Sequence, residues 1–143
     1  MFVISDVCGQ QADIMFLVDV SGSIQETDVR DWDRVKTFLK DSIRGLARLS
    51  SDARFSITIF SHDSYVYFKL DRYRTLDEVL NAVDDTPYVG ATTDMTSGFE
   101  AVRNEVIPGA RSGVPKILIL MTDGKPNEQV NGNLVNGFTA YPV

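Results

Sequence analysis

Two continuous apolar runs, each followed by an aspartate, constrain the fold of this chain most. Residues 14–18 are all apolar and directly precede Asp19. Residues 117–121 are all apolar, and one residue, Thr122, separates them from Asp123. Uninterrupted apolar segments of this length are typical of parallel strands that are covered on both faces. The sequence therefore predicts two central strands of a sheet that carries helices on either side.

The segments between these runs predict three helices and a hairpin. Residues 54–60 and 64–70, separated by the turn sequence SHD, predict a β-hairpin. Thr75 and Glu78 form a capping box before a short helix. Apolar residues at steps of three and four predict a long amphipathic helix that Thr27 or Asp28 caps, and a later helix that Pro108 and Gly109 end. The apolar positions of these two helices are, in turn, Val29, Trp32, Val35, Phe38, Leu39, Ile43, Leu46 and Leu49, and Phe99, Val102 and Val106.

This alternation of strands and helices predicts an α/β fold. We expect a doubly wound, open, mostly parallel sheet in which the hairpin supplies one antiparallel edge strand. A chain of 143 residues, 43% hydrophobic and 24% charged, suits one globular domain. A net charge of -6 argues against nucleic acid or an anionic membrane as a partner. No apolar run reaches the roughly 20 residues that span a bilayer.

Polar side chains cluster where the two apolar strands end. In open α/β sheets, ligands bind beyond the carboxyl ends of the strands, where the strand order reverses. If the two strands are neighbours, Asp19 and Asp123 converge there. Ser21 and Ser23 are two residues apart and can point in one direction, and Gly22 lets the backbone bend. Hydroxyls, carboxylates and waters are ligands that Mg²⁺ or Mn²⁺ accepts.

Three separated motifs resemble the von Willebrand factor A domain. They are DIMFLVDVSGSI, GATTDMTSGFEAV and PKILILMTDG, in that order. The resemblance covers residues 12–125 and is nearest to the extracellular-matrix branch, such as matrilins and the A domains of collagens. It implies a metal-ion-dependent adhesion site for Mg²⁺, or for Mn²⁺ or Ca²⁺. The hydroxyls would bind the metal directly and the aspartates partly through water, the ligands being Asp19, Ser21, Ser23, Thr93 and Asp123.

The threonine motif requires a choice between two adjacent residues. We predict Thr93 rather than Thr92, because the family pattern places the ligand five residues before a small residue packed in the helix, here Gly98. Met95 stands where the family often has a second threonine, a difference expected to affect hydrogen bonds around the ligands. Asp94 is expected to cap the following helix.

The resemblance implies a protein-binding function without catalysis. A cation held mainly by neutral hydroxyls stays attractive to an acid, so a glutamate or aspartate of a partner protein can complete its coordination. This implies a secreted adhesion or matrix-assembly module whose partner is collagen or another matrix protein. The alternative is an intracellular scaffold subunit of a larger ATP-driven or protein-quality-control assembly, which keeps the same site. Cys8, the only cysteine, is expected to be either a buried or unpaired thiol or the partner of a cysteine outside this sequence, and the second case would favour the matrix.

The sequence lacks the motifs of serine hydrolases and of phosphoryl-transfer enzymes. No Gly-x-Ser-x-Gly elbow or late histidine is present for a serine hydrolase, and no Gly-x-x-x-x-Gly-Lys phosphate loop occurs. An aspartyl phosphoryl-transfer enzyme would want a second acid where Ser21 stands. His62, the only histidine, is expected to be an exposed turn residue. Tyr88 is expected to be either a rim contact for a partner or a packed loop aromatic.

The two ends of the chain depart from the family. Residues 1–11 are expected to be an N-terminal extension, 12–125 an incomplete A domain, and 126–143 an atypical tail. A complete A domain would have about two more strands with their helices, and about 180 to 200 residues. Matrix A domains often bridge a cysteine before the first strand to one after the last helix, which implies an absent partner for Cys8. A final strand without its next neighbour would present an apolar edge open to self-association.

Overall fold

The sheet of this protein has two parallel strand pairs and one antiparallel pair. A computed structural model describes residues 10–25, 28 and 30–122. Within these residues four strands lie in the order β3-β2-β1-β4. β1 pairs in parallel with β2 and with β4, and β3 pairs antiparallel with β2 at the edge. The predicted hairpin is confirmed, and the two apolar runs are neighbours, which is the condition under which Asp19 and Asp123 were expected to converge. The strands are Gln11–Asp19 (β1), Asp52–Phe60 (β2), Ser64–Phe68 (β3) and Lys116–Met121 (β4).

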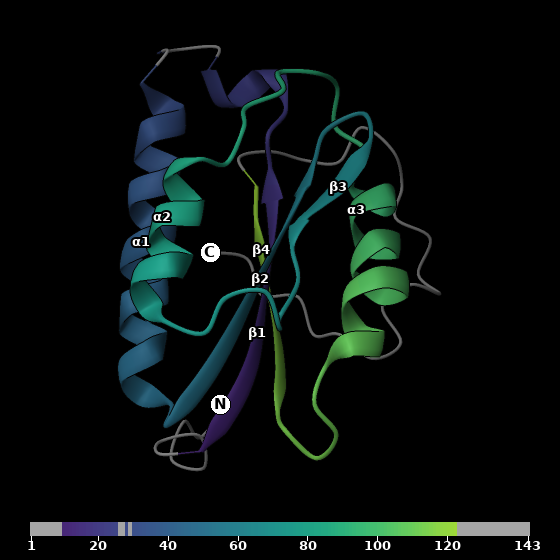
Figure 1. Cartoon of the computed structure of the whole chain (residues 1–143). Helices are drawn as coiled ribbons and strands as arrows, with labels where there is room; N and C mark the ends of the chain where they lie inside the picture. The colour runs from purple at the N-terminus through teal and green to yellow at the C-terminus, as the bar shows by residue number, and fades with distance from the viewer. Residues whose placement is uncertain (1–9, 26–27, 29, 123–143) are drawn as a thin grey trace, which may run out of the picture.

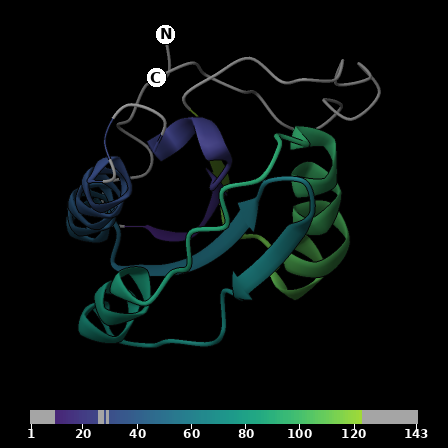
Figure 2. The same cartoon turned by 90° about the horizontal axis from the view of Figure 1, so that it is seen from above.

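Helices cover both faces of this sheet (Figure 1). Viewed from above, α1 and α2 lie on one side of the sheet and α3 lies on the other (Figure 2). α1 spans Asp31–Leu49, α2 spans Leu76–Asp84, and α3 spans Met95–Ala101. A π-helical turn, Val102–Val106, and a 3-10 turn, Ile107–Gly109, continue α3 and end at the predicted Pro108 and Gly109. The predicted doubly wound α/β fold is therefore confirmed. No helix among the described residues combines the length and apolar character needed to cross a membrane.

β1 is the central strand that its apolar run predicted. It lies between β2 and β4, and every residue from Ala12 to Asp19 is buried. Phe16 and Val18 pack into the cluster beneath α1 and α2, whereas Met15 and Leu17 pack into the cluster beneath α3. Because successive side chains of a strand point to opposite faces, a strand covered on both faces is apolar over its middle residues, here residues 14–18, between the buried Asp13 and Asp19.

α1 begins later than the sequence predicted. Arg30 is its N-cap residue and makes no capping side-chain hydrogen bond. Asp28 was therefore wrongly predicted as the cap. Its carboxylate instead accepts a hydrogen bond of 2.9 Å from the backbone N of Arg30, within the turn that precedes the helix. Hydrogen bonds from the Arg30 side chain and backbone lower the pKa of Asp28. Thr27 and Val29 lie outside the described residues.

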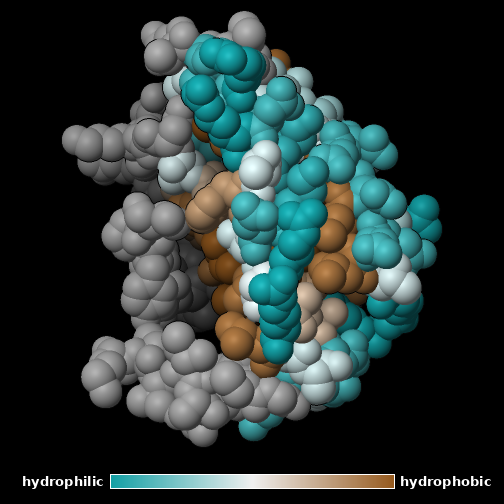
Figure 3. All heavy atoms as spheres, turned by 90° about the vertical axis from the view of Figure 1, so that its left-hand side faces the viewer, coloured by the Kyte–Doolittle hydropathy of each residue, from teal (hydrophilic) through white to brown (hydrophobic). Residues whose placement is uncertain are grey.

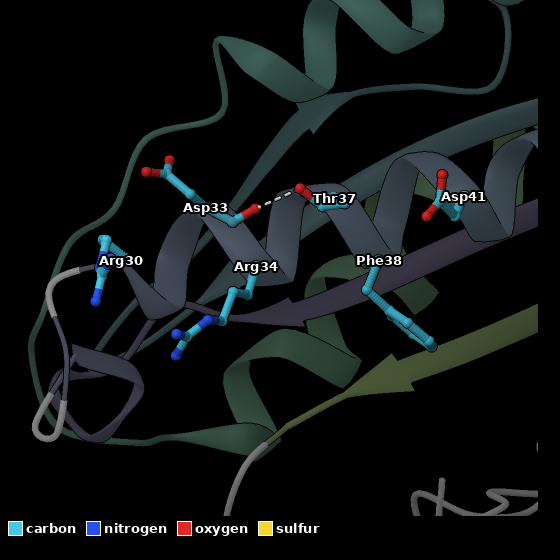
Figure 4. Close-up of a pocket in the computed structure, with 6 residues that line it drawn as sticks. All are labelled: Arg30, Asp33, Arg34, Thr37, Phe38 and Asp41. Atoms are coloured by element: carbon cyan, nitrogen blue, oxygen red, sulfur yellow. Dashed lines mark hydrogen bonds between the residues drawn. The ribbon is translucent and has the colours of Figure 1, made fainter.

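Phe38 does not lie on the buried face of α1 as predicted. Its side chain is 50% exposed, whereas that of Leu39 is fully buried. Adjacent helical residues are about 100° apart around the axis, so only one of the two can face the sheet centre. Phe38 instead lines a shallow hollow of about 500 Å³ with Arg34, Thr37 and Asp41 (Figure 4). Figure 3 shows this face, on which hydrophobic side chains are exposed beside hydrophilic ones.

β4 is less buried than its apolar sequence predicted. Its residues from Ile117 to Met121 are all partly exposed, although they contact the clusters on both faces. The physical reason is position: within the described residues β4 pairs only with β1 and stands at the edge of the sheet. The expected apolar edge is therefore present in the described part of the chain, and self-association through it stays a prediction.

The predicted capping box of α2 is confirmed. The Thr75 side chain accepts a hydrogen bond from Glu78 N at 3.3 Å, and Glu78 Oε2 accepts one from Thr75 N at 3.0 Å. Hydrogen bonds from the backbone N–H groups of Thr75 and Arg74 lower the pKa of Glu78. The carboxylate therefore stabilises this helix start above the usual glutamate pKa, and the stabilisation is lost as the pH falls through the lowered value.

Gly98 sets how closely α3 approaches the sheet, which gives a testable expectation. A Cβ atom on Gly98 would lie 2.9 Å from Leu17 Cδ1 and 3.1 Å from Phe60 Cβ. We expect Gly98→Ala to lower the free energy of unfolding by about 1–3 kcal/mol, because the core must shift to admit the methyl group. Urea unfolding measures this change.

Gly45 provides the matched control for Gly98. Gly45 lies in α1, and a Cβ atom added to it would meet no neighbouring atom within 4 Å. Gly45→Ala is therefore expected to raise the free energy of unfolding by up to about 1 kcal/mol through helix propensity alone. If Gly98→Ala were as stable as Gly45→Ala, the close packing of α3 would be contradicted.

Candidate metal centre

The carboxylate of Asp19 is buried at the carboxyl end of β1 and held from two sides. Asp19 is the last residue of β1 and only 1% exposed. Its Oδ1 accepts a hydrogen bond of 2.9 Å from Ser21 N, and its Oδ2 accepts one of 2.8 Å from Thr122 Oγ1. The two donors come from the loop after β1 and from the residue after β4. The carboxylate is therefore oriented by both strands that meet at this point of the sheet.

The two serine hydroxyls lie side by side, as the sequence predicted. The Oγ atoms of Ser21 and Ser23 are 3.0 Å apart at the start of a 3-10 turn, Gly22–Gln25. Adjacent oxygen ligands of an octahedral Mg²⁺ with bonds of 2.0–2.1 Å are separated by about 2.9 Å. The hydroxyl pair therefore fits two neighbouring positions of such an ion, and all of the candidate donors are hard oxygens.

The loop that carries Thr93 runs alongside the serine loop. Gly22 N donates to Ala91 O at 2.8 Å, and Gly90 N donates to Val20 O at 2.8 Å. Ser21 and Ala91 form a parallel bridge. A Cβ on Gly22 would lie 3.2 Å from Gly90 O, so glycine allows this close approach without displacing the neighbouring backbone. Two motifs that are about 70 residues apart in the sequence are thus joined by backbone hydrogen bonds, and Thr93 follows Ala91 by two residues.

The polar residues around Thr93 have different partners. Thr92 is exposed and its Oγ1 lies 3.2 Å from Nδ1 of His62, whereas Thr93 is half-buried. This pairing of Thr92 supports the choice of Thr93 as the ligand. His62 is exposed in the hairpin turn, as predicted. Asp94 caps α3 as predicted, because its carboxylate accepts a hydrogen bond of 3.1 Å from Ser97 N.

The second predicted aspartate, Asp123, lies outside the described residues. The strand arrangement on which its prediction rests is confirmed, since Met121 at the end of β4 is paired with Val18 of β1. Within the described ranges, no three His, Cys, Asp or Glu side chains gather as metal ligands. The candidate donors that the structure does bring together are the carboxylate of Asp19 and the hydroxyls of Ser21 and Ser23.

Tyr88 and Thr122 contact residues of the candidate site, although no sequence pattern indicated these contacts. Thr122 donates a hydrogen bond to Asp19, and Tyr88 contacts the serine loop. Tyr88 is a packed loop aromatic, one of its two expected roles. Its hydroxyl lies 2.9 Å from Ser21 O and 3.2 Å from Gly22 O, and its ring centroid is 5.8 Å from that of Trp32. No local pattern indicates these contacts, because Tyr88 and Ser21 are 67 positions apart.

The contact between Tyr88 and the serine loop can be tested by removing one oxygen. We expect Tyr88→Phe to weaken Mg²⁺ binding by about fivefold, the equivalent of one hydrogen bond of about 1 kcal/mol, because the serine loop loses its anchor. Calorimetric titration measures this change. Tyr65→Phe, on an exposed tyrosine of β3, is the control and should bind Mg²⁺ as the parent does. Equal Mg²⁺ affinity in all three proteins would contradict the anchoring role.

Comparison with known proteins gives a family match over most of the chain. A sequence model of the von Willebrand factor type A domain matches residues 13–136. The Collagen alpha-6(VI) chain of Mus musculus is 32% identical over 136 residues, which are 90% of this chain and 6% of that protein. Integrin alpha-1 of Gallus gallus is 30% identical over 125 residues, covering 85% of this chain and 42% of that protein. The chain thus spans a small part of the collagen VI relatives it matches.

Solved structures of one matrix protein resemble the whole fold. Proximal thread matrix protein 1 from the mussel byssus superposes with a TM-score of 0.80 at 26% identity, covering 93% of this chain and 35% of that one. A second structure of the same protein has zinc in its metal-ion-dependent adhesion site (MIDAS) motif. It superposes with a TM-score of 0.74 at 30% identity, covering 84% of this chain and 30% of that one.

Proposed function

Because the chain belongs to the von Willebrand factor type A domain family, we propose that it is a divalent-cation-dependent protein-binding module. It binds a carboxylate of a partner protein at the end of β1. The observation that supports this most directly is the pair of hydroxyls of Ser21 and Ser23, 3.0 Å apart, beside the buried carboxylate of Asp19. The zinc-occupied motif of the mussel protein is consistent with a metal at this place in the fold.

The proposed ligand set combines neutral and charged oxygens. Asp19, Ser21, Ser23, Thr93 and Asp123 would hold the cation, which we propose to be Mg²⁺. The cation supplies a positive charge and a coordination position that a partner carboxylate can take. Both oxygens of Asp19 already accept hydrogen bonds, which disperses their negative charge. Neutral hydroxyls add no charge, so the site keeps its attraction for an acid.

The proposed role is adhesion or matrix assembly, not catalysis. Collagen VI chains and a thread matrix protein are among the relatives, which favours a secreted matrix module over the intracellular scaffold. His62 contacts Thr92 and not a serine of the site, so it is not placed as a base for a serine nucleophile. We propose collagen or another matrix protein as the partner, and residues 12–125 as the domain that carries the site.

Binding to collagen tests this function directly. The chain is passed over immobilised native collagen VI in a buffer with Mg²⁺ and then in the same buffer with EDTA. We expect binding only with Mg²⁺, and none to collagen whose carboxyl groups have been esterified, because the partner must offer an ionised acid. Binding that survives both EDTA and esterification would contradict the proposal. Metal-dependent binding to other matrix proteins alone would reject collagen as the partner.

A further inference from the structure

We propose that a groove beside the metal centre selects partners that carry an aliphatic side chain close to the bound acid. The groove has a volume of about 300 Å³ and lies between the β2–β3 turn and the loop that leads to Thr93. This inference rests on the proposed function, because the bound acid places the partner chain. The groove is lined by the apolar residues Val20, Ile59, Val89 and Ala91, by Tyr65, and by the polar residues Ser61, His62, Asp63 and Ser64.

The groove has a buried floor and exposed walls. Val20, Ile59 and Ser61 are 1%, 4% and 3% exposed and form the floor. Tyr65 on β3 and Val89 on the loop line the groove as well, and they are 63% and 56% exposed. When a partner side chain covers large apolar side chains that are exposed to solvent, the free energy of the complex is lowered. An aliphatic side chain between these walls would cover both.

The floor of the groove is held in place by the backbone. Val20 N donates to Phe60 O at 2.9 Å, and Val20 O accepts from Gly90 N at 2.8 Å. Asp94 N donates to Ser61 O at 2.6 Å and fixes the far end of the loop. The groove is therefore preformed in the free protein, and a partner loses little affinity to ordering it.

The groove is continuous with the metal centre. Val20 directly precedes Ser21, and Ala91 forms a bridge with Ser21. Bridged residues of neighbouring strands are separated by about 4.8 Å, and an extended peptide advances about 3.3 Å per residue. A partner whose acid is bound near Ser21 therefore brings a side chain one or two positions away to the groove.

Charge at the mouth of the groove disfavours a second acid there. Asp63 lines the groove and is exposed, next to the exposed His62. A partner carboxylate in the groove would be repelled by Asp63, whereas an uncharged aliphatic side chain would not. We therefore identify the occupant as an extended protein segment with one acidic residue and a leucine-like residue within two positions of it.

Three synthetic peptides test the selection. They are Leu-Gly-Glu-Gly-Leu, Ala-Gly-Glu-Gly-Ala and Leu-Gly-Gln-Gly-Leu, each blocked at both ends and titrated into the chain by NMR with saturating Mg²⁺. We expect the leucine peptide with glutamate to bind about tenfold more tightly than its alanine counterpart, a ratio typical of apolar pockets. Equal affinities of these two peptides would overturn the inference. The glutamine peptide should not bind.

Substitutions of Val89 and Tyr65 test whether the groove walls cause the preference for the leucine peptide. Val89→Ser and Tyr65→Ser should each reduce the tenfold preference for leucine to about twofold or less, with Mg²⁺ affinity unchanged. Leu49→Ser is the matched control, because Leu49 is an exposed apolar residue, 42% accessible, at the far end of α1. It should keep the full preference. A preference that persists in both wall variants would place the selection elsewhere and overturn the inference.

The same titrations separate failure of the groove from failure of the metal centre. If Mg²⁺ does not bind, or if the glutamate and glutamine peptides bind equally, the proposed function fails. If Mg²⁺ binds and glutamate is required, but leucine and alanine are not distinguished, only the groove inference fails.

Discussion

Replacing Ser21 by alanine is expected to weaken Mg²⁺ binding by about a hundredfold or more while the fold remains. Ser21 contributes one oxygen of the hydroxyl pair, which is 3.0 Å apart. Loss of groups that only orient metal ligands typically costs 10–100-fold in affinity, and loss of a ligand should cost at least about the upper value. The hydrogen bond from residue 21 to Asp19 uses the backbone N and is kept in alanine. Calorimetric titration with Mg²⁺ measures the affinity.

Thermal unfolding gives a second measurement of the same effect. A ligand present at 100 times its dissociation constant stabilises the folded state by about 2.7 kcal/mol. We expect the parent chain to gain this amount on addition of Mg²⁺ and Ser21→Ala to gain almost none. Ser112→Ala, at an exposed serine, is the control and should behave as the parent does. Equal heats and equal stabilisation in the parent and Ser21→Ala would reject the assignment of this residue.

Replacing Arg111 by methionine is expected to lower the free energy of unfolding by about 3–5 kcal/mol. Asp13 is completely buried in β1, and Arg111 N and Nε donate to its carboxylate at 2.7 and 2.8 Å. Arg111 also reaches Asp52 of β2, with Nη1 2.7 Å from Oδ2. Removing the guanidinium would leave the carboxylate of Asp13 buried without its counter-charge, which is the costly case for a buried pair. Urea unfolding measures the loss.

Two further variants show whether the cost comes from the buried charge. Arg44→Met removes an exposed ion pair with Asp41 and should cost less than about 1 kcal/mol. Adding Asp13→Asn to Arg111→Met should recover part of the lost stability, because no unpaired charge is then buried. An Arg111→Met variant as stable as Arg44→Met would contradict this account. Asp13 lies at the opposite end of β1 from Asp19, so Mg²⁺ affinity should be unchanged.

The sequence predicted best where local pattern and burial coincide. The apolar run of β1 identified a strand covered on both faces. Its pairing with β4 was only a condition of the predicted site, and the structure supplied it. The capping box of α2 and the cap of α3 were equally predictable, because Thr75, Glu78 and Asp94 act on backbone groups within three residues of themselves. The direction of the serine hydroxyls followed from their spacing of two.

The predictions that failed concern how much of an element is covered and where a helix begins. Phe38 is apolar and fits the helical spacing, yet it faces outward because Leu39 takes the buried position beside it. β4 has the composition of a central strand but is an edge strand in the described residues. Asp28 has the chemistry of a helix cap, but the turn around Arg30 delays the helix. In each case the residue type was compatible with two environments.

The amino-acid sequence was sufficient to predict the fold class, the end of the sheet where the polar groups gather, and the oxygen chemistry of the candidate site. These depend on residue order, spacing and strand direction, all of which are local. Tertiary structure alone decided that Thr122 orients Asp19, that Tyr88 anchors the serine loop, and that Arg111 neutralises Asp13. Those contacts join residues 67 to 103 positions apart. No local periodicity encodes them, because they arise only when packing brings distant backbone segments together.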